Sequence, residues 1–386
     1  MVKFKKIIVL TSSPFNERDY KRFGIETFQK NDFEVEVWDL TPFLNVDRNL
    51  KCQPSDRIQA AWIRLFMNKR DTAFAISDLP EGSIVLAMIA YSYDTYAIYR
   101  ALSKKNILYF TWAFSYPSVF FDRNKIDLLS KMRRASFKKL AHFFFPRLPF
   151  ALLGIHPLAA LLVLGGKVVY SHLPVNNKTH LIWSHTPDYE VYLEESKAPA
   201  RAEEHTGVFL DACLPLHPDL AASDRIPAEK YFPLLHKFFD LIERETGTRI
   251  IIAAHPRSPF ENYSDFFGGR TVVRGQTASL VKNADFVISH DSCSISYAVL
   301  FKRPVIFITT NDLLKKTEGT QINFMASLLG KRAINLDNDY SSINLDKELE
   351  VNENAYIQYK NDYIKKDGSE DLPLWQSFSQ YIRGLK

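Results

Sequence analysis

The clearest pattern in the chain is the alternation of short apolar runs with longer amphipathic segments. Apolar runs at residues 6–11, 83–90 and 107–112 are separated by helical patterns, for example at residues 19–30 and 93–105. Apolar runs without polar alternation are typical of parallel strands that are covered on both faces. The first part of the chain therefore predicts strand–helix–strand units in a parallel sheet.

The same alternation begins again after residues 196–206 (SKAPARAEEHT), which have no apolar period and which we interpret as a linker. Strands and helices of the second half are expected at residues 208–211, 227–245, 249–254, 277–283, 286–289, 294–301 and 305–309. The sequence thus predicts an α/β protein with two Rossmann-like doubly wound domains that face each other across a cleft. Their expected bounds are residues 1–196 and 207–370, and a helix at residues 371–386 is expected to pack back on the first domain.

A basic stretch precedes the longest apolar stretch of the chain. Residues 123–147 contain eight Lys or Arg residues and a single acid, Asp127. The apolar residues 148–166 are interrupted by Pro149 and Pro157, and a spanning helix needs about 20 apolar residues, so we do not expect a transmembrane span. Two interpretations stay open: peripheral contact with an anionic membrane through residues 123–166, or a buried helix with a solvated basic face.

Composition narrows the class of protein. A net charge of +5 over 386 residues is too weakly basic to indicate a nucleic-acid partner. The three cysteines, Cys52, Cys213 and Cys293, lie far apart, which favours reduced thiols in a cytoplasmic protein over a zinc site or disulfides. The first apolar run is too short for a signal peptide. We expect a cytoplasmic protein, with peripheral attachment to the inner face of the membrane as the alternative.

Polar side chains follow the expected strands of the second domain. These are His255 and Arg257 after residues 249–254, and Asp291, Ser292 and Ser294 after residues 286–289. Ligands of open α/β sheets bind beyond the carboxyl ends of the strands, and a helix that starts at Ser294 would offer N–H groups to an anion. Arg257 would make a bidentate phosphate contact and His255 would donate to the same anion. The alternative is that Ser292 only caps a helix and His255 is structural.

Two aspartates are candidates for the catalytic carboxylate. A carboxylate beside a bound ligand can serve as a general base or as a nucleophile. Asp211 ends the first strand of the second domain, and Asp188 follows an expected strand at residues 180–184. His185 is a candidate partner for either carboxylate. The alternative for Asp188 is that it caps the helix that begins after Pro187.

Three segments in a fixed order, IIAAHPR (251–257), LVKNADFVISHDSCS (280–294) and AVLFKRPVIF (298–307), resemble GT-B glycosyltransferases. More narrowly, they look like enzymes with cytidine-activated donors: bacterial sialyl- and polysialyltransferases, capsule Kdo transferases and the CDP-glycerol polymerases of teichoic acid synthesis. The resemblance implies that His255, Ser292 and Ser294 hold the donor phosphate and cytidine, with Thr277 near the base or ribose. Cys293 separates the two serines, which departs from the tandem-serine pattern and leaves open which hydroxyl faces the ligand.

The resemblance implies a metal-independent glycosyltransferase that moves an ulosonic or nonulosonic acid (Kdo, sialic, legionaminic or pseudaminic type) from a CMP donor to a glycan or lipid-linked glycan of a surface polysaccharide, such as capsule or lipopolysaccharide. No cofactor or metal is expected, and Asp337-Asn338-Asp339 is interpreted as a loop. The alternatives are a CDP-glycerol or UDP-sugar transferase, a UDP-sugar 2-epimerase with a glutamate near residues 316–319, and a non-catalytic nucleotide- or polysaccharide-binding protein.

Overall fold

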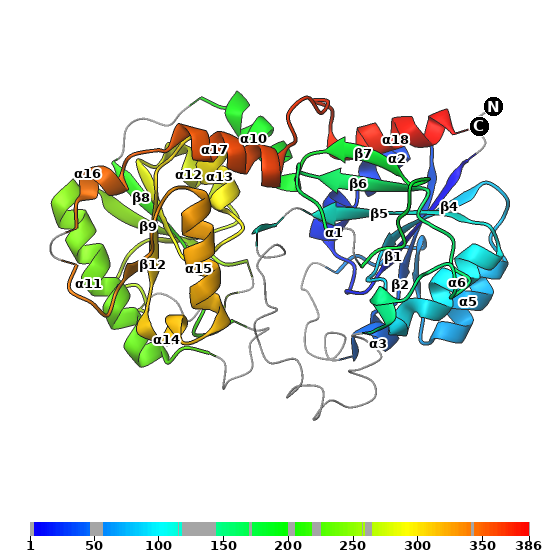
Figure 1. Cartoon of the computed structure of the whole chain (residues 1–386), viewed down its shortest axis with the longest axis horizontal. Coiled ribbons are helices and arrows are strands. Elements are labelled where there is room, and N and C mark those ends of the chain that lie inside the picture. The colour runs from blue at the N-terminus through cyan, green and yellow to red at the C-terminus, as the bar shows by residue number, and fades with distance from the viewer. Residues whose placement is uncertain are drawn as a thin grey trace. The chain divides into compact units, whose positions relative to one another are not determined.

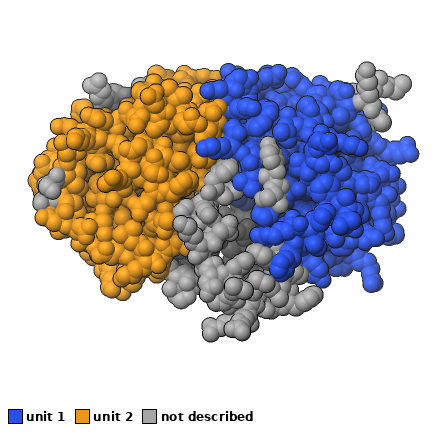
Figure 2. Space-filling model, viewed as in Figure 1, with its two compact units in different colours: residues 1–115, 122–185, 366–386 blue, residues 116–121, 186–365 orange. Residues whose placement is uncertain are grey.

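The computed structural model describes residues 4–46, 57–114, 116–117, 144–169, 172–199, 205–217, 225–256, 258, 265–340 and 343–385. The chain forms two compact units (Figure 1 and Figure 2). Unit 1 comprises residues 1–115, 122–185 and 366–386, and unit 2 comprises residues 116–121 and 186–365. Each unit is built on one parallel sheet, so the predicted class of two Rossmann-like α/β domains is confirmed.

The sheet of unit 1 has the strand order β3-β2-β1-β4-β5-β6-β7, and all its strands are parallel. The strands are β1 (Lys6–Thr11), β2 (Glu34–Asp39), β3 (Ile63–Leu65), β4 (Ser83–Met88), β5 (Leu108–Phe114), β6 (Ala160–Leu164) and β7 (His180–Ser184). The helices are α1 (Glu17–Arg22), α2 (Ile25–Lys30), α3 (Thr41–Leu44), α5 (Lys69–Ser77), η1 (Tyr93–Thr95), α6 (Tyr96–Lys104), η2 (Phe145–Arg147) and α18 (Leu374–Gly384).

Each face of this sheet has its own apolar core. Successive side chains of a strand point to opposite faces. Ile8 and Leu10 of β1 accordingly join a cluster that includes residues of α5 and α6. Ile7 and Val9 join the other cluster, which includes residues of α2 and α18. Burial on both faces explains why the strands of this unit appear in the sequence as continuous apolar runs.

The sheet of unit 2 has the order β10-β9-β8-β11-β12-β13 and is also parallel. Its strands are β8 (Thr206–Leu210), β9 (Arg249–Ala254), β10 (Val272–Arg274), β11 (Phe286–Ser289), β12 (Val305–Thr309) and β13 (Ile334–Asn335). The helices are α10 (Pro187–Lys197), α11 (Ala228–Thr246), α12 (Thr277–Asn283), α13 (Ile295–Leu300), α14 (Asn311–Leu314), α15 (Thr317–Leu328), α16 (Leu345–Glu348), α17 (Glu353–Tyr359) and the π-helix η5 (Lys360–Ile364).

The division between the units lies earlier in the chain than the linker that the sequence indicates. It falls between His185 and Thr186, because α10 packs against α12 and α13 and so belongs to unit 2. The chain returns to unit 1 at residue 366, where α18 packs on α2 and β7. Within that unit the Trp375 indole donates a hydrogen bond to the Arg22 carbonyl oxygen at 2.9 Å.

Two segments differ from the expected elements. The helix expected at residues 19–30 is two short helices, because Gly24 between them has a φ of +70°, which breaks the helical backbone. The apolar residues 148–166 form turns followed by the buried strand β6, not a helix. Of the basic stretch 123–147, residues 123–143 lie outside the described residues. Among the described residues no helix is long and apolar enough to cross a membrane.

Candidate functional site

The strand order of unit 2 locates the point where ligands bind in open α/β sheets. From β8 the sheet grows through β9 to β10 in one direction, and from β11 through β12 to β13 in the other. The topological switch point therefore lies between the neighbouring strands β8 and β11, and the crevice beyond their carboxyl ends is the expected binding position. The residues that follow β8, β9 and β11 include most of those that the sequence singles out.

Asp211 follows β8 and is almost completely buried, with 5% of its surface exposed. Its Oδ1 accepts a hydrogen bond from the Cys213 backbone N–H at 2.8 Å. This contact holds the turn in which Cys213 takes a φ of +54°, a conformation that costs energy for a residue other than glycine. Oδ2 is buried and has no hydrogen-bond partner among the described residues. Burial raises the pKa of Asp211 to about 6, although the backbone N–H groups of Cys213 and His255 oppose the shift.

Two histidine rings meet beside Asp211. His255 follows β9 and is half-buried, and its ring centroid lies 5.1 Å from that of His217, in the loop after β8. The Ser258 hydroxyl and backbone N–H both donate to the His255 carbonyl oxygen, at 2.8 and 3.0 Å, which fixes the turn after β9. The sequence analysis did not propose His217 as a site residue. Arg257, which the sequence analysis did propose, lies outside the described residues.

The loop after β11 is anchored by a buried histidine. His290 Nδ1 lies 2.8 Å from the Ile308 carbonyl oxygen, and Nε2 lies 2.7 Å from the Tyr231 hydroxyl. The carbonyl requires a proton on Nδ1, so Nε2 accepts from Tyr231 in the neutral ring. Burial lowers the pKa of His290 to about 4, which keeps the ring neutral near pH 7. His290 therefore positions the residues that follow it and is not available to a ligand.

Asp291 comes next and is half-buried. Burial and then the negative charge of Glu318, at the start of α15, raise the pKa of Asp291 to about 6. The close approach of α14 to α15 depends on Gly319, since a Cβ at that position would lie 2.5 Å from the Leu313 carbonyl oxygen. Glu318 thus belongs to the surroundings of Asp291. The sequence suggested this segment only through the epimerase alternative.

The serines of this loop take part in local turns. The Ser292 hydroxyl accepts from the Ser294 backbone N–H at 3.3 Å. The N–H groups of Ile295 and Ser296 donate to the carbonyl oxygens of Ser292 and Cys293 at 3.1 and 3.2 Å. The first turn of α13 therefore uses N–H groups that the sequence argument assigned to an anion. What remains for a ligand is the loop itself, with the half-buried Ser292 and Ser294 and the exposed Cys293.

Asp188 lies in the first turn of α10, as expected for a residue that starts a helix after proline. Its Oδ1 accepts a hydrogen bond from the Tyr297 hydroxyl of α13 at 3.4 Å. Burial, followed by the charge of Asp188, raises the pKa of Tyr297. Asp188 therefore links α10 to α13 within unit 2.

His185 and Thr277 are the remaining candidates from the sequence. His185 belongs to unit 1, where it is buried, and its Nε2 lies 3.0 Å from the Leu372 carbonyl oxygen. The chain divides directly after it, so His185 and Asp188 belong to different units. Thr277 is the first residue of α12, follows β10 and is half-buried.

Asp337, in the loop after β13, is hydrogen-bonded to the segment that follows β12. The Asn311 backbone N–H donates to Asp337 Oδ2 at 2.7 Å, and Asn335 Nδ2 donates to Asn311 Oδ1 at 2.8 Å. Asp337 therefore has the loop role that the sequence indicated. In the described part of the chain, no group of three or more His, Cys, Asp or Glu side chains could hold a metal ion.

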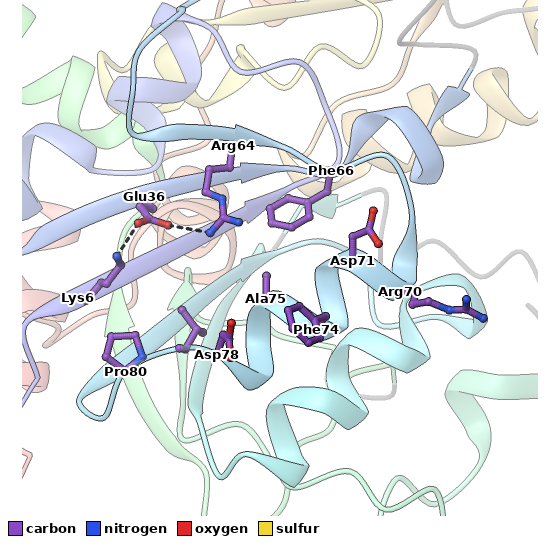
Figure 3. A pocket seen from close by; sticks show the side chains of 11 residues that line it. Lys6, Glu36, Arg64, Phe66, Arg70, Asp71, Phe74, Ala75, Asp78 and Pro80 are labelled. Carbon is purple, nitrogen blue, oxygen red and sulfur yellow. Dashed lines mark hydrogen bonds and ion pairs between the residues drawn. The ribbon is translucent and has the colours of Figure 1, made fainter.

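Two hollows among the described residues of unit 1 differ in character. One, of about 590 Å³, lies beside α5, where Lys6, Glu36 and Arg64 reach into it from β1, β2 and β3 (Figure 3). Glu36 pairs with Lys6 at 2.5 Å and with Arg64 at 4.0 Å. The other hollow, of about 270 Å³, is lined by Asp39, at the carboxyl end of β2, and by Arg57, whose ion pair spans 3.7 Å. Only the second lies at strand ends of the kind that bind ligands.

Comparison with known proteins identifies the type of fold. No known protein family matches the sequence, and no curated protein matches it. Among solved structures, a variant of the wall teichoic acid polymerase TagF has a TM-score of 0.52 and 13% sequence identity, covering 99% of this chain and 88% of that one. MurG of Acinetobacter baumannii has a TM-score of 0.49 and 10% identity, covering 99% and 100%.

A UDP-GlcNAc 2-epimerase of Methanocaldococcus jannaschii has a TM-score of 0.48 and 12% identity, covering 95% of this chain and 98% of that one. At such identities a likeness establishes the fold alone. The chain has the GT-B type of architecture, two Rossmann-like domains in one chain.

Proposed function

We propose that this chain is a transferase that uses a nucleotide-activated donor, and that the nucleotide binds at the carboxyl edge of the sheet of unit 2. One observation carries the proposal. Residues from three separate segments, Asp211, His255 and Asp291, follow the strands β8, β9 and β11 on both sides of the switch point of a doubly wound sheet. Ser292 and Ser294, in the loop after β11, are further candidates for contact with the donor.

The side chains suggest a division of roles. His255, with His217 against it, would donate hydrogen bonds to the phosphate of the donor and stabilise the charge of the leaving nucleotide, without a metal ion. Asp211, whose pKa is raised to about 6, would serve as the base that takes the acceptor proton. The acceptor oxygen then bonds to the anomeric carbon of the donor sugar while the bond from that carbon to the phosphate oxygen breaks, and the electron pair of the broken bond stays on the nucleotide phosphate. Asp188, with His185 as its candidate partner, is the alternative carboxylate for this step.

The donor that we propose is a CMP-linked ulosonic or nonulosonic acid, and the acceptor is a surface glycan or lipid-linked glycan. The support is the ordered resemblance of residues 251–257, 280–294 and 298–307 to enzymes with cytidine-activated donors. The hollow beside Asp39 and Arg57 at the carboxyl edge of unit 1 is our candidate for the acceptor position.

A second candidate is a transferase of the CDP-glycerol type. The solved structure with a TM-score of 0.52 is a wall teichoic acid polymerase, and the same ordered segments resemble CDP-glycerol polymerases. Both candidates release CMP, whereas a UDP-sugar transferase releases UDP and a 2-epimerase needs no acceptor. Identification of the released nucleotide therefore separates the cytidine donors from the uridine donors.

The assignment of His255 is tested by substitution. His255→Ala should lower kcat/KM for the donor by about a hundredfold, because a preorganised donor to the developing charge is lost. His205→Ala is the matched control, since His205 is exposed and precedes β8 at the opposite edge of the same sheet. Steady-state kinetics that are the same for the two variants would refute the site.

A further inference from the structure

We propose that the loop of residues 144–156 in unit 1 docks on an anionic lipid surface. The inference does not rest on the donor site, which belongs to unit 2. It rests on exposed apolar side chains, on a backbone whose polar groups are paired within the loop, and on the charge of the surrounding segment.

Apolar side chains at three positions of the loop lie on the surface. Phe144, Leu148 and Leu152 expose 45%, 48% and 83% of their surface. Leu152 has the largest exposed fraction of any large apolar residue in the described part of the chain. Phenylalanine and leucine are side chains that enter the boundary between head groups and acyl chains.

The backbone of the loop is held by its own hydrogen bonds. The N–H groups of Leu152, Leu153 and Gly154 donate to the carbonyl oxygens three residues before them, at 3.0 to 3.1 Å. Such local pairing lowers the cost of moving a turn out of water, since unpaired backbone groups are expensive in an apolar medium. The turn can therefore meet a lipid surface without refolding.

The loop is anchored to α6 and the residues around it. Phe145 is buried, and its ring centroid lies 5.3 Å from that of Tyr91 and 5.6 Å from that of Tyr96. The Tyr96 hydroxyl donates to the Leu153 carbonyl oxygen at 3.1 Å, and the His156 N–H donates to the Ser103 hydroxyl at 2.9 Å. The exposed Leu148 and Leu152 are thus presented from a fixed base.

The part of the sequence that contains the loop is rich in basic residues. Residues 95–187 contain 13 Lys or Arg residues and two acids, Asp122 and Asp127, whereas the rest of the chain contains 36 basic and 42 acidic residues. The segment thus carries a net charge of +11, and the remainder is net negative. Among the described residues, Arg147 in the loop and Arg100, Lys104 and Lys105 of the α6 segment are exposed.

Exposed apolar side chains, together with Arg147 in the same loop and a basic flanking sequence, complement a membrane with anionic lipids, where each Lys or Arg near the surface adds to binding and long side chains keep their charges in water. A lipid surface with anionic head groups needs no matching shape, whereas a partner protein would need an acidic and apolar surface that fits the loop. We therefore assign the loop to lipid.

The test is co-sedimentation of the full chain with vesicles. Vesicles of phosphatidylcholine with about one-third phosphatidylglycerol should bind the protein, vesicles of phosphatidylcholine alone should bind it weakly, and salt should reduce binding. The double variant Leu148→Ser/Leu152→Ser should lower the partition coefficient at least about tenfold. Phe74→Ser is the matched control, because Phe74 on α5 of the same unit is 68% exposed.

Three results would overturn the proposal: no binding of the full chain to anionic vesicles, equal binding of the double variant, or an equal loss in Phe74→Ser. A fourth would be concentration-dependent self-association without lipid that the double variant abolishes, since the loop would then be an interface between copies of the chain.

Discussion

The two carboxylate oxygens of Asp211 have different surroundings. Its Oδ1 fixes the turn at Cys213, while its Oδ2 is buried and has no hydrogen-bond partner among the described residues. Buried polar atoms are nearly always paired in folded proteins, so an unpaired carboxylate oxygen at a strand end of the expected binding edge supports the role that we propose for Asp211. The same burial that makes Asp211 a stronger base also costs stability.

Asp211→Asn should stabilise the protein in a pH-dependent way. The pKa of Asp211 is about 6 in the folded chain and 3.8 when unfolded, so the folded state binds the proton more tightly. The ionised carboxyl destabilises the fold fully above pH 6, and this penalty disappears as the pH falls toward 3.8. The variant should therefore gain up to about 3 kcal/mol at pH 8 and less at pH 5.

Urea unfolding followed by circular dichroism at both pH values measures this difference. Asp265→Asn, at an exposed aspartate of the same unit, is the control and should show little change. A stability gain that is the same at pH 5 and pH 8 would speak against a raised pKa of Asp211.

At the level of elements, the docking of α18 on unit 1 depends on a glycine. A Cβ at Gly24 would lie 2.2 to 2.6 Å from atoms of the Trp375 indole, so the two cannot coexist without a shift of α18. Gly24 also has a φ of +70°, which an alanine adopts only at a cost. The position combines a steric and a conformational requirement for glycine.

Gly24→Ala should therefore destabilise unit 1 more than Gly154→Ala does. Gly154 has a φ of +67° but no atom within 4 Å of an added Cβ, so it carries the conformational cost alone. We expect an additional loss of about 1–3 kcal/mol for Gly24→Ala from overpacking. All five tryptophans lie in unit 1, so urea unfolding by tryptophan fluorescence reports on that unit. Equal losses of unfolding free energy in the two variants would mean that the Trp375 side chain moves aside at little energetic cost.

Elements were predictable where the pattern is long and its cause is local. The strands β1, β9 and β12 and the helix α11 lie where the apolar runs and the amphipathic period place them. The break at Gly24 and the short strands β3, β10 and β13 were not predicted. Strands of two or three residues have no readable period, and the apolar period of residues 19–30 does not reveal that Gly24 takes a positive φ.

At the scale of the whole molecule, the sequence indicated which strand ends carry chemistry but not which side chains meet. The rule that parallel strands end at one edge was enough to predict that the loops after β9 and β11 share that edge. The contact between His217 and His255, and the hydrogen bond from Tyr231 to His290, depend on how loops and α11 pack. Periodicity contains no information about such contacts.

The central claim, that the carboxyl edge of unit 2 binds a cytidine nucleotide, is tested most directly by thermal unfolding of the full chain with CMP, CDP, UMP, UDP, GDP and ADP in parallel. A ligand that binds the native state raises the melting temperature by mass action. The account predicts a selective rise with the cytidine nucleotides that His255→Ala loses and His205→Ala keeps. Absence of a rise with every nucleotide, or a rise that persists unchanged in His255→Ala, would contradict it.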